Sequence, residues 1–545
     1  MTNKEKDFND ILKNNGDNGN EILNDYISSV ITEAAKDLPA LELQAALEKE
    51  KADKEKAAAE KAAEDKQNFK SVFSGNLSDL SNSNRLYNLY GKIIRRNIDS
   101  GEWLIYSDGK WTSMGKDNDE LLFLTCKVAK YIEENRPRMN YIQNADGAIT
   151  QDSNKPQNSL ESVQFGKSLS NKWQKVKTQR NAITLLKGNE NIRIYQADLD
   201  KNPMLLNVQN GVIDLETCKL YPAAPELLLT KQANAFFNPA ARAPVFEKFM
   251  QQILPDEETR EAMLRYLGYC LTGLTVEEKV FFAYGKGGNG KGTLLGTIQT
   301  LLGDYATSFK IGVLLKQKYG VNPDAASPEI AKLKGVRFAV VSESKDVKQF
   351  DTATLKDLTG GDIITAREMY KPPISFKPSH KFALQGNNLP APENIADEGF
   401  LRRFYIIKFL ESFIGKAANL DLKAELVTAD SLNGILALLV KQCLKWQQEG
   451  LIISEAMKAA KEEYIVENDF VREFIFDNCE LYAGQCILRK EFLLRLREDK
   501  KISPAQYTDK KLAELITSIN GITEKEIRTR GPKAFFGVKW LDSAE

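Results

Sequence analysis

Four short apolar runs, KVFFAY, VRFAVVS, HKFALQ and RRFYIIKF, lie between residues 279 and 409 and alternate with segments such as TLLGTIQTLL and FDTATLKDL. Runs of this length are typical of buried strands, and apolar residues three or four apart are typical of one helix face. Their alternation predicts an α/β domain with helices around a sheet. Two more helical patterns, VFEKFMQQIL and ETREAMLRYLGYCLTGL, precede this block.

Changes in this patterning divide the chain into five predicted parts. The first is polar and contains the Ala-, Glu- and Lys-rich run Leu41–Lys66; it favours a solvated helix over a coiled coil because it lacks apolar heptads. The second mixes helical patterns with short strands and turns at Asp108–Lys110 and Asn210–Gly211. The predicted parts are an arm or spacer (1–81), an α+β domain (82–245), the α/β domain (246–420), a helical connector (421–467) and a domain of helices with a final strand pair (468–545).

Composition restricts the chemistry. Lys and Arg number 75, as do Asp and Glu, so any basic surface must be local. The N-terminus has no apolar signal core, and no apolar run approaches the about 20 residues that span a bilayer, so we expect a cytoplasmic protein with no membrane partner. Six scattered cysteines without a C-x-x-C pair, and a single histidine, His380, argue against zinc sites and Ser-His-Asp catalysis.

A phosphate-binding loop is predicted in FFAYGKGGNGKGTLLGTI, because Gly285, Gly290 and Lys291 have the spacing G-x-x-x-x-G-K between an apolar run and a helical pattern. Such glycines let backbone amides point at phosphate oxygens. The position after Lys291 usually carries a hydroxyl for the metal, but here it is Gly292, and the hydroxyl comes one residue later, on Thr293. The alternative is a plain glycine-rich turn, which the lysine and the flanking elements disfavour.

Polar residues follow three of the apolar runs. Glu343 is expected to hold the metal and polarise water, although Ser342 stands where many NTPases have a second acid. Asn387 and Asn388 could sense the γ-phosphate. Arg402 and Arg403 could stabilise a neighbouring subunit's transition state. A surface glutamate and a salt-bridged arginine pair remain the alternatives.

These runs, GKGGNGKGT, VRFAVVSES, LKDLTGGDIITAREMYKPPISFKPSHKFALQGNNLP and DEGFLRRFYIIKF, resemble in order and spacing the superfamily 3 helicases of the phage and plasmid primase family, whose relatives include poxvirus-type primase-helicases. The resemblance extends from about Asn82 to Phe409. It implies an AAA+-like motor that binds ATP and Mg²⁺, assembles as a ring, usually a hexamer, and moves on DNA. The implied fold is therefore an α/β superfamily 3 motor after an α+β N-terminal domain.

Site residues follow from this resemblance. It implies that Glu343 is the Walker B acid, that Asn387 is the sensor, since the family pattern reads Asn-x-Leu-Pro, and that Arg402 or Arg403 is the finger. Thr293 and Glu343 would hold the metal. The implied nucleotide-binding residues are Gly285, Lys286, Gly287, Gly288, Asn289, Gly290, Lys291, Gly292 and Thr293.

Two segments are candidates for DNA contact. In such helicases a hairpin between the acid and the sensor moves DNA, and DIITAREMYKPPISFKP fits it, with Lys371 at the tip, Lys377 as second choice and Tyr370 as a stacking candidate. A solvated lysine and a core tyrosine are the alternatives. The tail from Gly484 has 13 Lys/Arg against 9 Asp/Glu and resembles a winged helix. Its expected duplex phosphate contacts are Arg528, Arg530 and Lys533, and a protein-docking winged helix is the alternative.

The sequence therefore predicts a ring-forming, ATP-dependent DNA helicase that replicates a phage, plasmid or mobile element in a bacterial host, as a homo-oligomer working with other replication proteins. The residues before Asn82 are too few for the primase domain that family members often carry, so we do not expect primase activity. The alternative is an AAA+ initiator or assembly switch that binds DNA without processive unwinding. A packaging or defence NTPase is disfavoured by the tail pattern.

Overall fold

The structure is a computed structural model. It describes residues 63, 67–68, 71–73, 76–135, 141–143, 149–151, 160–316, 327–342, 349–370, 373–387, 389–392, 397–413, 421–502, 507–517, 519–529 and 531–541. Most of the predicted arm, residues 1–81, lies outside this set. The chain forms two compact units, one of residues 1–96 and 115–193 and the other of residues 97–114 and 194–545.

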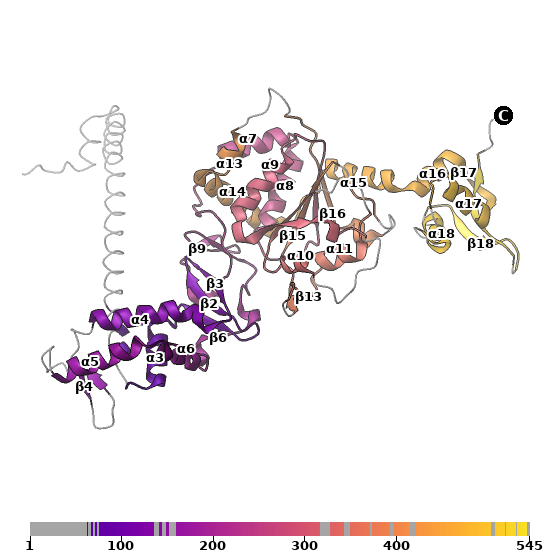
Figure 1. The fold of residues 1–545 in the computed structure, drawn as a ribbon. Helices are drawn as coiled ribbons and strands as arrows, with labels where there is room; N and C mark the ends of the chain where they lie inside the picture. Colours follow the sequence, from indigo (N-terminus) through magenta and orange to yellow (C-terminus); the bar gives the residue numbers. More distant parts are fainter. Residues whose placement is uncertain are drawn as a thin grey trace, which may run out of the picture. The chain divides into compact units, whose positions relative to one another are not determined.

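The first unit is mainly helical (Figure 1). Its core contains Leu86, Val128 and Ile183, which come from three different helices. A buried Asn82 side chain accepts hydrogen bonds from Trp173 Nε1 at 3.0 Å and from Arg85 Nη1 at 2.9 Å, which ties two of the helices together. The elements are α3 (Asp79–Tyr90), α4 (Leu122–Asn135), β4 (Tyr141–Gln143), β5 (Ile149–Gln151), α5 (Leu160–Trp173) and α6 (Val176–Leu186).

The second unit begins with antiparallel strands. β2 (Trp103–Ser107) and β3 (Lys110–Gly115) are neighbours in one sheet, and β7 (Leu205–Val208), β8 (Gly211–Asp214) and β9 (Lys219–Tyr221) form another. The hairpin predicted around Asn210–Gly211 is present, but its turn is one residue earlier, at Gln209–Asn210, because Val208 pairs with Gly211 and Gly211 begins β8. β1 (Ile94–Asn97) and β6 (Arg193–Ile194) lie where the chain passes between the units.

A five-stranded parallel sheet forms the centre of this unit, as the alternating pattern predicted. Its order is β11-β12-β15-β10-β16, and every neighbouring pair is parallel. β10 is the first strand of this sheet along the chain, and it lies inside the sheet between β15 and β16. The strands are β10 (Val280–Tyr284), β11 (Ala306–Lys310), β12 (Phe338–Ser342), β15 (Lys381–Gly386) and β16 (Phe404–Lys408).

Both faces of this sheet are covered, which explains why its strands are continuous apolar runs. On one face Phe281, Ala383 and Ile407 pack in the same core as α9 (Lys291–Leu302), α7 (Pro244–Ile253), α8 (Glu257–Tyr269) and α14 (Ala429–Glu449). On the other face Phe282, Leu384 and Ile406 pack with α11 (Thr352–Thr359), α12 (Glu398–Leu401) and α15 (Glu455–Asn468). Figure 1 shows α7, α8 and α9 grouped on one side of β15 and β16, and α11 on the other.

Residues 470–541 form a small α/β part with its own core, which includes Phe474, Phe492 and Phe535. The predicted helices and final strand pair are present. Helix, strand, helix, helix, strand and strand follow in order, and the antiparallel sheet has the order β17-β19-β18. The elements are α16 (Phe470–Asn478), β17 (Cys479–Leu488), α17 (Arg489–Asp499), α18 (Asp509–Thr517), β18 (Thr523–Glu526) and β19 (Lys533–Trp540).

The remaining elements are short. They are α10 (Pro328–Ala331), β13 (Ile364–Ala366), β14 (Ile374–Phe376), α13 (Leu422–Leu426), and the 3-10 helices η2 (Asn118–Leu121), η4 (Glu190–Ile192), η5 (Gln196–Asp198), η6 (Pro225–Leu227), η7 (Gly303–Tyr305) and η8 (Ile311–Val313).

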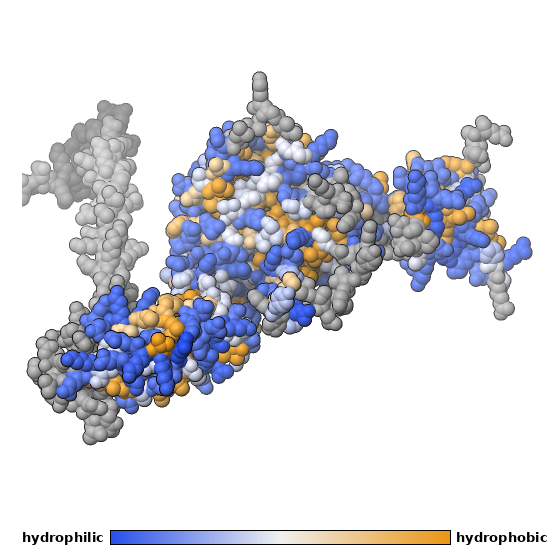
Figure 2. All heavy atoms as spheres, viewed as in Figure 1, coloured by the Kyte–Doolittle hydropathy of each residue, from blue (hydrophilic) through white to orange (hydrophobic). Residues whose placement is uncertain are grey.

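The compact units divide the chain differently from the predicted domains. Residues 97–114 and 194–245 group with the parallel sheet, whereas the sequence placed residues 82–245 in one domain. None of the described helices has the length and apolar character needed to cross a bilayer. Figure 2 shows hydrophilic residues spread over the visible face of every coloured part of the chain.

Candidate nucleotide-binding site

The glycine-rich loop connects the end of β10 to the start of α9, as predicted. Gly285 and Gly290 have φ angles of 147° and 86°, a region that residues with a Cβ rarely adopt. A Cβ on Gly285 would lie 2.3 Å from the Phe409 carbonyl oxygen, and one on Gly290 would lie 2.5 Å from Ile253 Cγ2. The two glycines that define the motif are therefore required by the backbone and by its close neighbours.

Hydrogen bonds hold this loop against the ends of two strands. The Gly285 amide donates to the Gly386 carbonyl at 3.3 Å, and Asn289 Nδ2 donates to the Phe409 carbonyl at 2.9 Å. The Phe413 amide donates to the Gly288 carbonyl at 2.8 Å. These bonds fix the loop beside the C-terminal ends of β15 and β16.

Lys291 is the first residue of α9, and its side chain lies along the loop. Its residue exposure is 7%. Its ammonium group donates to the carbonyls of Gly285 and Lys286 and to Asn289 Oδ1 at 3.0 Å. A buried ammonium needs such partners, and phosphate oxygens are the same kind of acceptor. The lysine is thus held where it can exchange loop oxygens for those of an anion.

A cavity of about 410 Å³ opens in front of the loop. It lies at the C-terminal ends of the strands, beside the loop that follows β10 and the end of the central strand β15, which is where open α/β sheets bind ligands. Two lysines line it, and none of its described lining residues carries a carboxylate. The lining consists of Gly287, Gly288, Asn289, Gly290, Lys291, Gly292, Thr293, Ser342, Gln385, Gly386, Asn387 and Lys423.

Most of the predicted nucleotide residues meet at this cavity. Asn387 reaches it from the end of β15, and Thr293 reaches it from the first turn of α9. Ser342, the last residue of β12, lines it where many NTPases have an acid. The predicted acid Glu343 lies outside the described residues. The described lining therefore supplies hydroxyl and amide oxygens, of the hard kind that Mg²⁺ accepts.

Three residues of the lining, Gln385, Gly386 and Lys423, were missed by the sequence analysis. Gln385 lies two residues before Asn387, and residues two apart share a face of a strand, so the strand period could have indicated it. Lys423 comes from α13, far along the chain. It belongs to no motif, and only the packing of α13 beside the loop brings it to the cavity.

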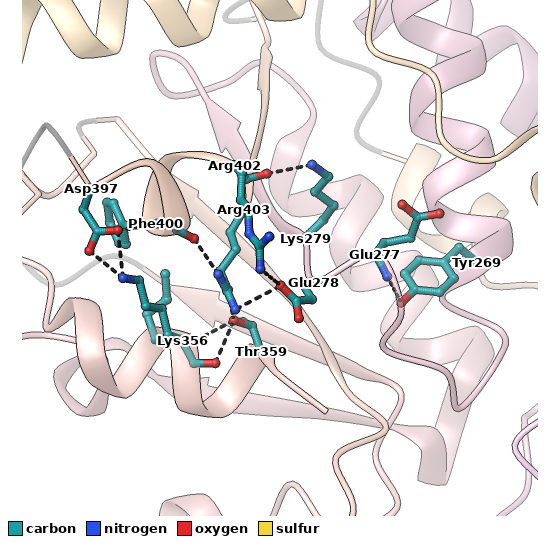
Figure 3. Close-up of polar contacts among 12 residues, drawn as sticks. Tyr269, Glu277, Glu278, Lys279, Lys356, Thr359, Asp397, Phe400, Arg402 and Arg403 are labelled. Carbon is teal, nitrogen blue, oxygen red and sulfur yellow. Dashed lines mark hydrogen bonds and ion pairs between the residues drawn. The ribbon is translucent and has the colours of Figure 1, made fainter. Parts of the chain in front are cut away.

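The two predicted arginines have different environments (Figure 3). Arg403 is buried: its Nε donates to Thr359 Oγ1 at 2.9 Å, and it also donates to the Gly399 carbonyl. The Arg402 side chain is 65% exposed and pairs with Glu278 at 2.6 Å. Glu278 also contacts Arg403 at 3.0 Å. Arg403 therefore belongs to the interior of its own subunit, whereas Arg402 is on the surface.

The predicted DNA hairpin is present as β13 and β14, which pair in antiparallel register from Ile364–Phe376 to Ala366–Ile374. Tyr370, in the connection between them, is fully exposed and has a φ of 61°, so a core role for this tyrosine is wrong. Lys377 is exposed just after β14. Lys371, the predicted tip lysine, lies outside the described residues.

The predicted duplex contacts are at the turn between β18 and β19. Arg528 is exposed in this turn, and Lys533 is exposed at the start of β19. The turn is closed by a hydrogen bond from the Gly531 amide to the Arg528 carbonyl at 2.6 Å. Arg530 lies outside the described residues. Two of the three predicted cations thus project from one hairpin.

Two family models match the chain. Residues 83–255 match the family described as "D5 N terminal like", and residues 283–403 match a family of unknown function, DUF5906. The second match begins in β10 and ends at Arg403, so it includes the loop, Ser342, Gln385 and Asn387. Lys423 lies beyond both matches.

Among curated proteins, the chain is 32% identical over 302 residues to a protein of Acanthamoeba polyphaga mimivirus named "Putative helicase"; the match covers 52% of this chain and 31% of that protein. It is 27% identical over 191 residues to a protein of African swine fever virus named "Putative primase", with 34% of this chain and 20% of that protein covered. The chain thus spans about a third or less of these relatives' lengths.

Among solved structures, the apo structure of the NrS-1 C-terminal region is similar with a TM-score of 0.46 and 12% identity, covering 85% of this chain and 100% of that chain. A likeness at this level has no bearing on activity.

Proposed function

The chain is a relative of the D5-type primase-helicases, and we propose that it is an ATP-dependent DNA helicase that works as a ring. The cavity of about 410 Å³ carries this proposal. It joins the glycine loop, the ends of two parallel strands and two lysines, which is the arrangement that a nucleoside triphosphate requires.

ATP binding is proposed at this cavity. The loop amides and the start of α9 supply partial positive charge to the phosphates. Lys291 would exchange its contacts with the Gly285 and Lys286 carbonyls for β- and γ-phosphate oxygens. Asn387 would orient the γ-phosphate or the attacking water from the end of β15.

Magnesium, when bound with ATP, would neutralise charge on the β- and γ-phosphates. Thr293 and Ser342 offer hydroxyl oxygens at the cavity, and Glu343 is the proposed acid. These are oxygen ligands of the kind that suits Mg²⁺, which usually keeps several waters.

We propose that each ATP site is completed by an arginine from the neighbouring subunit of an assembly. Arg402 is the proposed finger, because it is exposed, whereas Arg403 is buried in its own subunit. An arginine supplied from a neighbouring subunit accelerates phosphate transfer by about 10³–10⁵. A ring, with a hexamer as the expected form, places one subunit's Arg402 at the next subunit's cavity.

DNA is the proposed partner of the exposed hairpin and of the tail. Tyr370 would stack on a base of the strand held in the ring, while Lys371 and Lys377 hold phosphates. The order of elements in residues 470–541 is that of a winged helix, and its β18–β19 turn would contact duplex phosphates through Arg528, Arg530 and Lys533.

The proposed role is replication of a mobile replicon, such as a phage or plasmid in a bacterial cytoplasm, together with other replication proteins. The named relatives are proteins of viruses. They support the mobile replicon, but as proteins of viruses of eukaryotes they give no support to a bacterial host.

Strand displacement on a forked duplex with ATP tests the proposal. The intact protein should unwind the fork, and Lys291→Ala should lower the rate by about 100-fold, the usual effect of losing one donor to the transition state. Lys441→Ala, on the exposed face of α14, is the matched lysine control. Equal unwinding by the intact protein and Lys291→Ala would overturn the motor assignment. ATPase activity without unwinding would favour an initiator or assembly switch.

A further inference from the structure

One position of the phosphate loop lacks the hydroxyl that the motif usually provides, and the tertiary structure brings another oxygen to that place. We propose that the amide oxygen of Gln385 ligates the magnesium ion of bound MgATP in place of a side-chain hydroxyl at Gly292. This inference rests on the ATP site proposed above and assigns a metal ligand that lies on a different element from the loop.

The sheet register places Gln385 beside the loop. Gln385 pairs with Ser342 across β15 and β12 and with Ala283 across β15 and β10. It therefore stands between the strand that enters the loop and the strand that ends in Ser342. All of these strands end at the cavity, which Gln385 and Ser342 line.

A hydrogen bond orients the amide. Gln385 Nε2 donates to Ser342 Oγ at 3.2 Å. The nitrogen end of the amide thus faces β12, and the oxygen end faces α9. Gln385 Oε1 lies 3.6 Å from the place where a Cβ on Gly292 would be. The oxygen is accordingly next to the position from which a serine or threonine hydroxyl would extend.

Thr293 is the other candidate for the missing hydroxyl, but the helix turns it away from that position. Successive residues of an α-helix are rotated by about 100° about its axis. Thr293 also lines the cavity, yet it points in a direction different from that of Gly292. An amide oxygen is a suitable Mg²⁺ ligand, so Gln385 can supply what position 292 lacks.

Position 292 and position 385 therefore become alternative sources of one ligand oxygen. Apart from the two neighbouring residues and the backbone of α9 itself, the atom found within 4 Å of a Cβ at Gly292 among the described residues is Gln385 Oε1, at an ordinary contact distance. A serine at 292 fits, and it fits most freely when Gln385 is shortened. A hydroxyl at 292 should then rescue the loss of the amide at 385.

Calorimetric binding of ATPγS, measured in Mg²⁺ and in EDTA, tests this rescue. We expect Gln385→Ala to weaken binding in Mg²⁺ by about 10-fold, the lower end of the effect of removing a metal-site partner, and to leave binding in EDTA unchanged. Gln385→Glu keeps a side-chain oxygen at this place, so its binding of ATPγS should still differ between Mg²⁺ and EDTA as in the intact protein. Gln385→Ala with Gly292→Ser should recover most of the lost affinity.

Matched variants separate the explanations. Gly296→Ser adds the same hydroxyl to α9 at an exposed position with nothing within 4 Å of its Cβ among described residues, and combined with Gln385→Ala it should give no recovery. Equal weakening of Gln385→Ala in Mg²⁺ and in EDTA would overturn the proposal, as would a loss of the Mg²⁺ effect in Thr293→Val but not in Gln385→Ala. Unaltered binding by Lys291→Ala would instead overturn the ATP site itself.

Discussion

At the scale of single residues, the cavity lining is positively charged: Lys291 and Lys423 face it, and its described residues include no carboxylate. This charge suits the triphosphate that we propose to bind there, because charge-assisted hydrogen bonds to phosphate are among the stronger ones. The Lys291 ammonium must give up its hydrogen bonds to the loop oxygens before it can bind a phosphate. Lys423 is exposed on a five-residue helix and can reach a phosphate without that exchange.

Lys423→Ala should therefore raise the Kd for ATP by about 10-fold, since a hydrogen bond to a charged group contributes about 1.5–3 kcal/mol. Calorimetry with ATPγS measures it, and Lys441→Ala on α14 is the exposed-lysine control. An unchanged Kd in Lys423→Ala would show that α13 does not contribute to the phosphate site.

The buried histidine predicts a pH effect that is separate from the site. Burial lowers the pKa of His380 to about 3 from its ordinary value near 6.5. The unfolded chain therefore takes up a proton near pH 6.5, whereas the folded chain does not until about pH 3, so stability falls as pH is lowered across this window. Between pH 7 and pH 5 the loss is about 2 kcal/mol.

His380→Phe should remove that loss. The ring already contacts Phe382, with centroids 4.8 Å apart, so a phenyl group is accommodated. Denaturant unfolding at pH 7 and pH 5 measures the difference, and His380 is the only histidine in the chain. The neighbouring Lys381, whose pKa burial lowers to about 7, affects both proteins alike. An equal loss of unfolding free energy in the intact protein and in His380→Phe would contradict the role given to His380.

At the scale of elements, the described part of the connection between β13 and β14 is largely exposed. Tyr370 is fully exposed, and Met369 beside it is 59% exposed. An exposed aromatic residue in a left-handed conformation has no packing reason to be there. Stacking on a base would use it.

Tyr370→Ala should weaken binding of single-stranded DNA by about 1–3 kcal/mol, the usual contribution of one stacked base, while the Kd for ATP stays unchanged. Fluorescence anisotropy with a labelled oligonucleotide measures it. Tyr195→Ala, at an exposed tyrosine elsewhere in the chain, is the control. Equal DNA affinity of Tyr370→Ala and the intact protein would exclude the hairpin as a stacking site.

At the scale of the whole molecule, the two adjacent arginines differ in their exposure and therefore in whether a second subunit could contact them. Arg403 is satisfied within its own chain by Thr359, Gly399 and Glu278. Among the described residues, the Arg402 side chain pairs with Glu278 at 2.6 Å, and Lys279 Nζ donates to its backbone carbonyl at 2.6 Å. The surface position of Arg402 is what a contact in trans requires.

Arg402→Ala should leave stability unchanged and lower ATPase activity by about 10³-fold. Mixing it with Lys291→Ala should restore part of the activity, because some interfaces then pair an intact loop with an intact Arg402. Arg403→Ala should instead lower stability by about 1–3 kcal/mol, because it leaves the Thr359 hydroxyl and the Gly399 carbonyl without their buried donor. Absence of any recovery in the mixture, under conditions where both variants assemble, would argue against a shared site.

Much of this could be predicted from the sequence because the relevant signals are local. The loop, its flanking strand and helix, the hairpin around Asn210, and the last two helices and final strand pair of the tail all depend on residues close together in the chain. Two placements could not be predicted: that of Gln385 beside Gly292, which depends on the register of the strands, and that of Lys423 at the cavity, which depends on packing between distant segments.

The sequence by itself determined that a glycine-rich turn with a lysine opens a helix after a buried strand, because backbone conformation and burial period are written in neighbouring residues. Only the tertiary structure decided which oxygen stands beside Gly292, which lysine faces the cavity from α13, and which of two adjacent arginines is exposed. Those outcomes depend on side-chain direction and on contacts between segments that are far apart in the chain, which local periodicity does not specify.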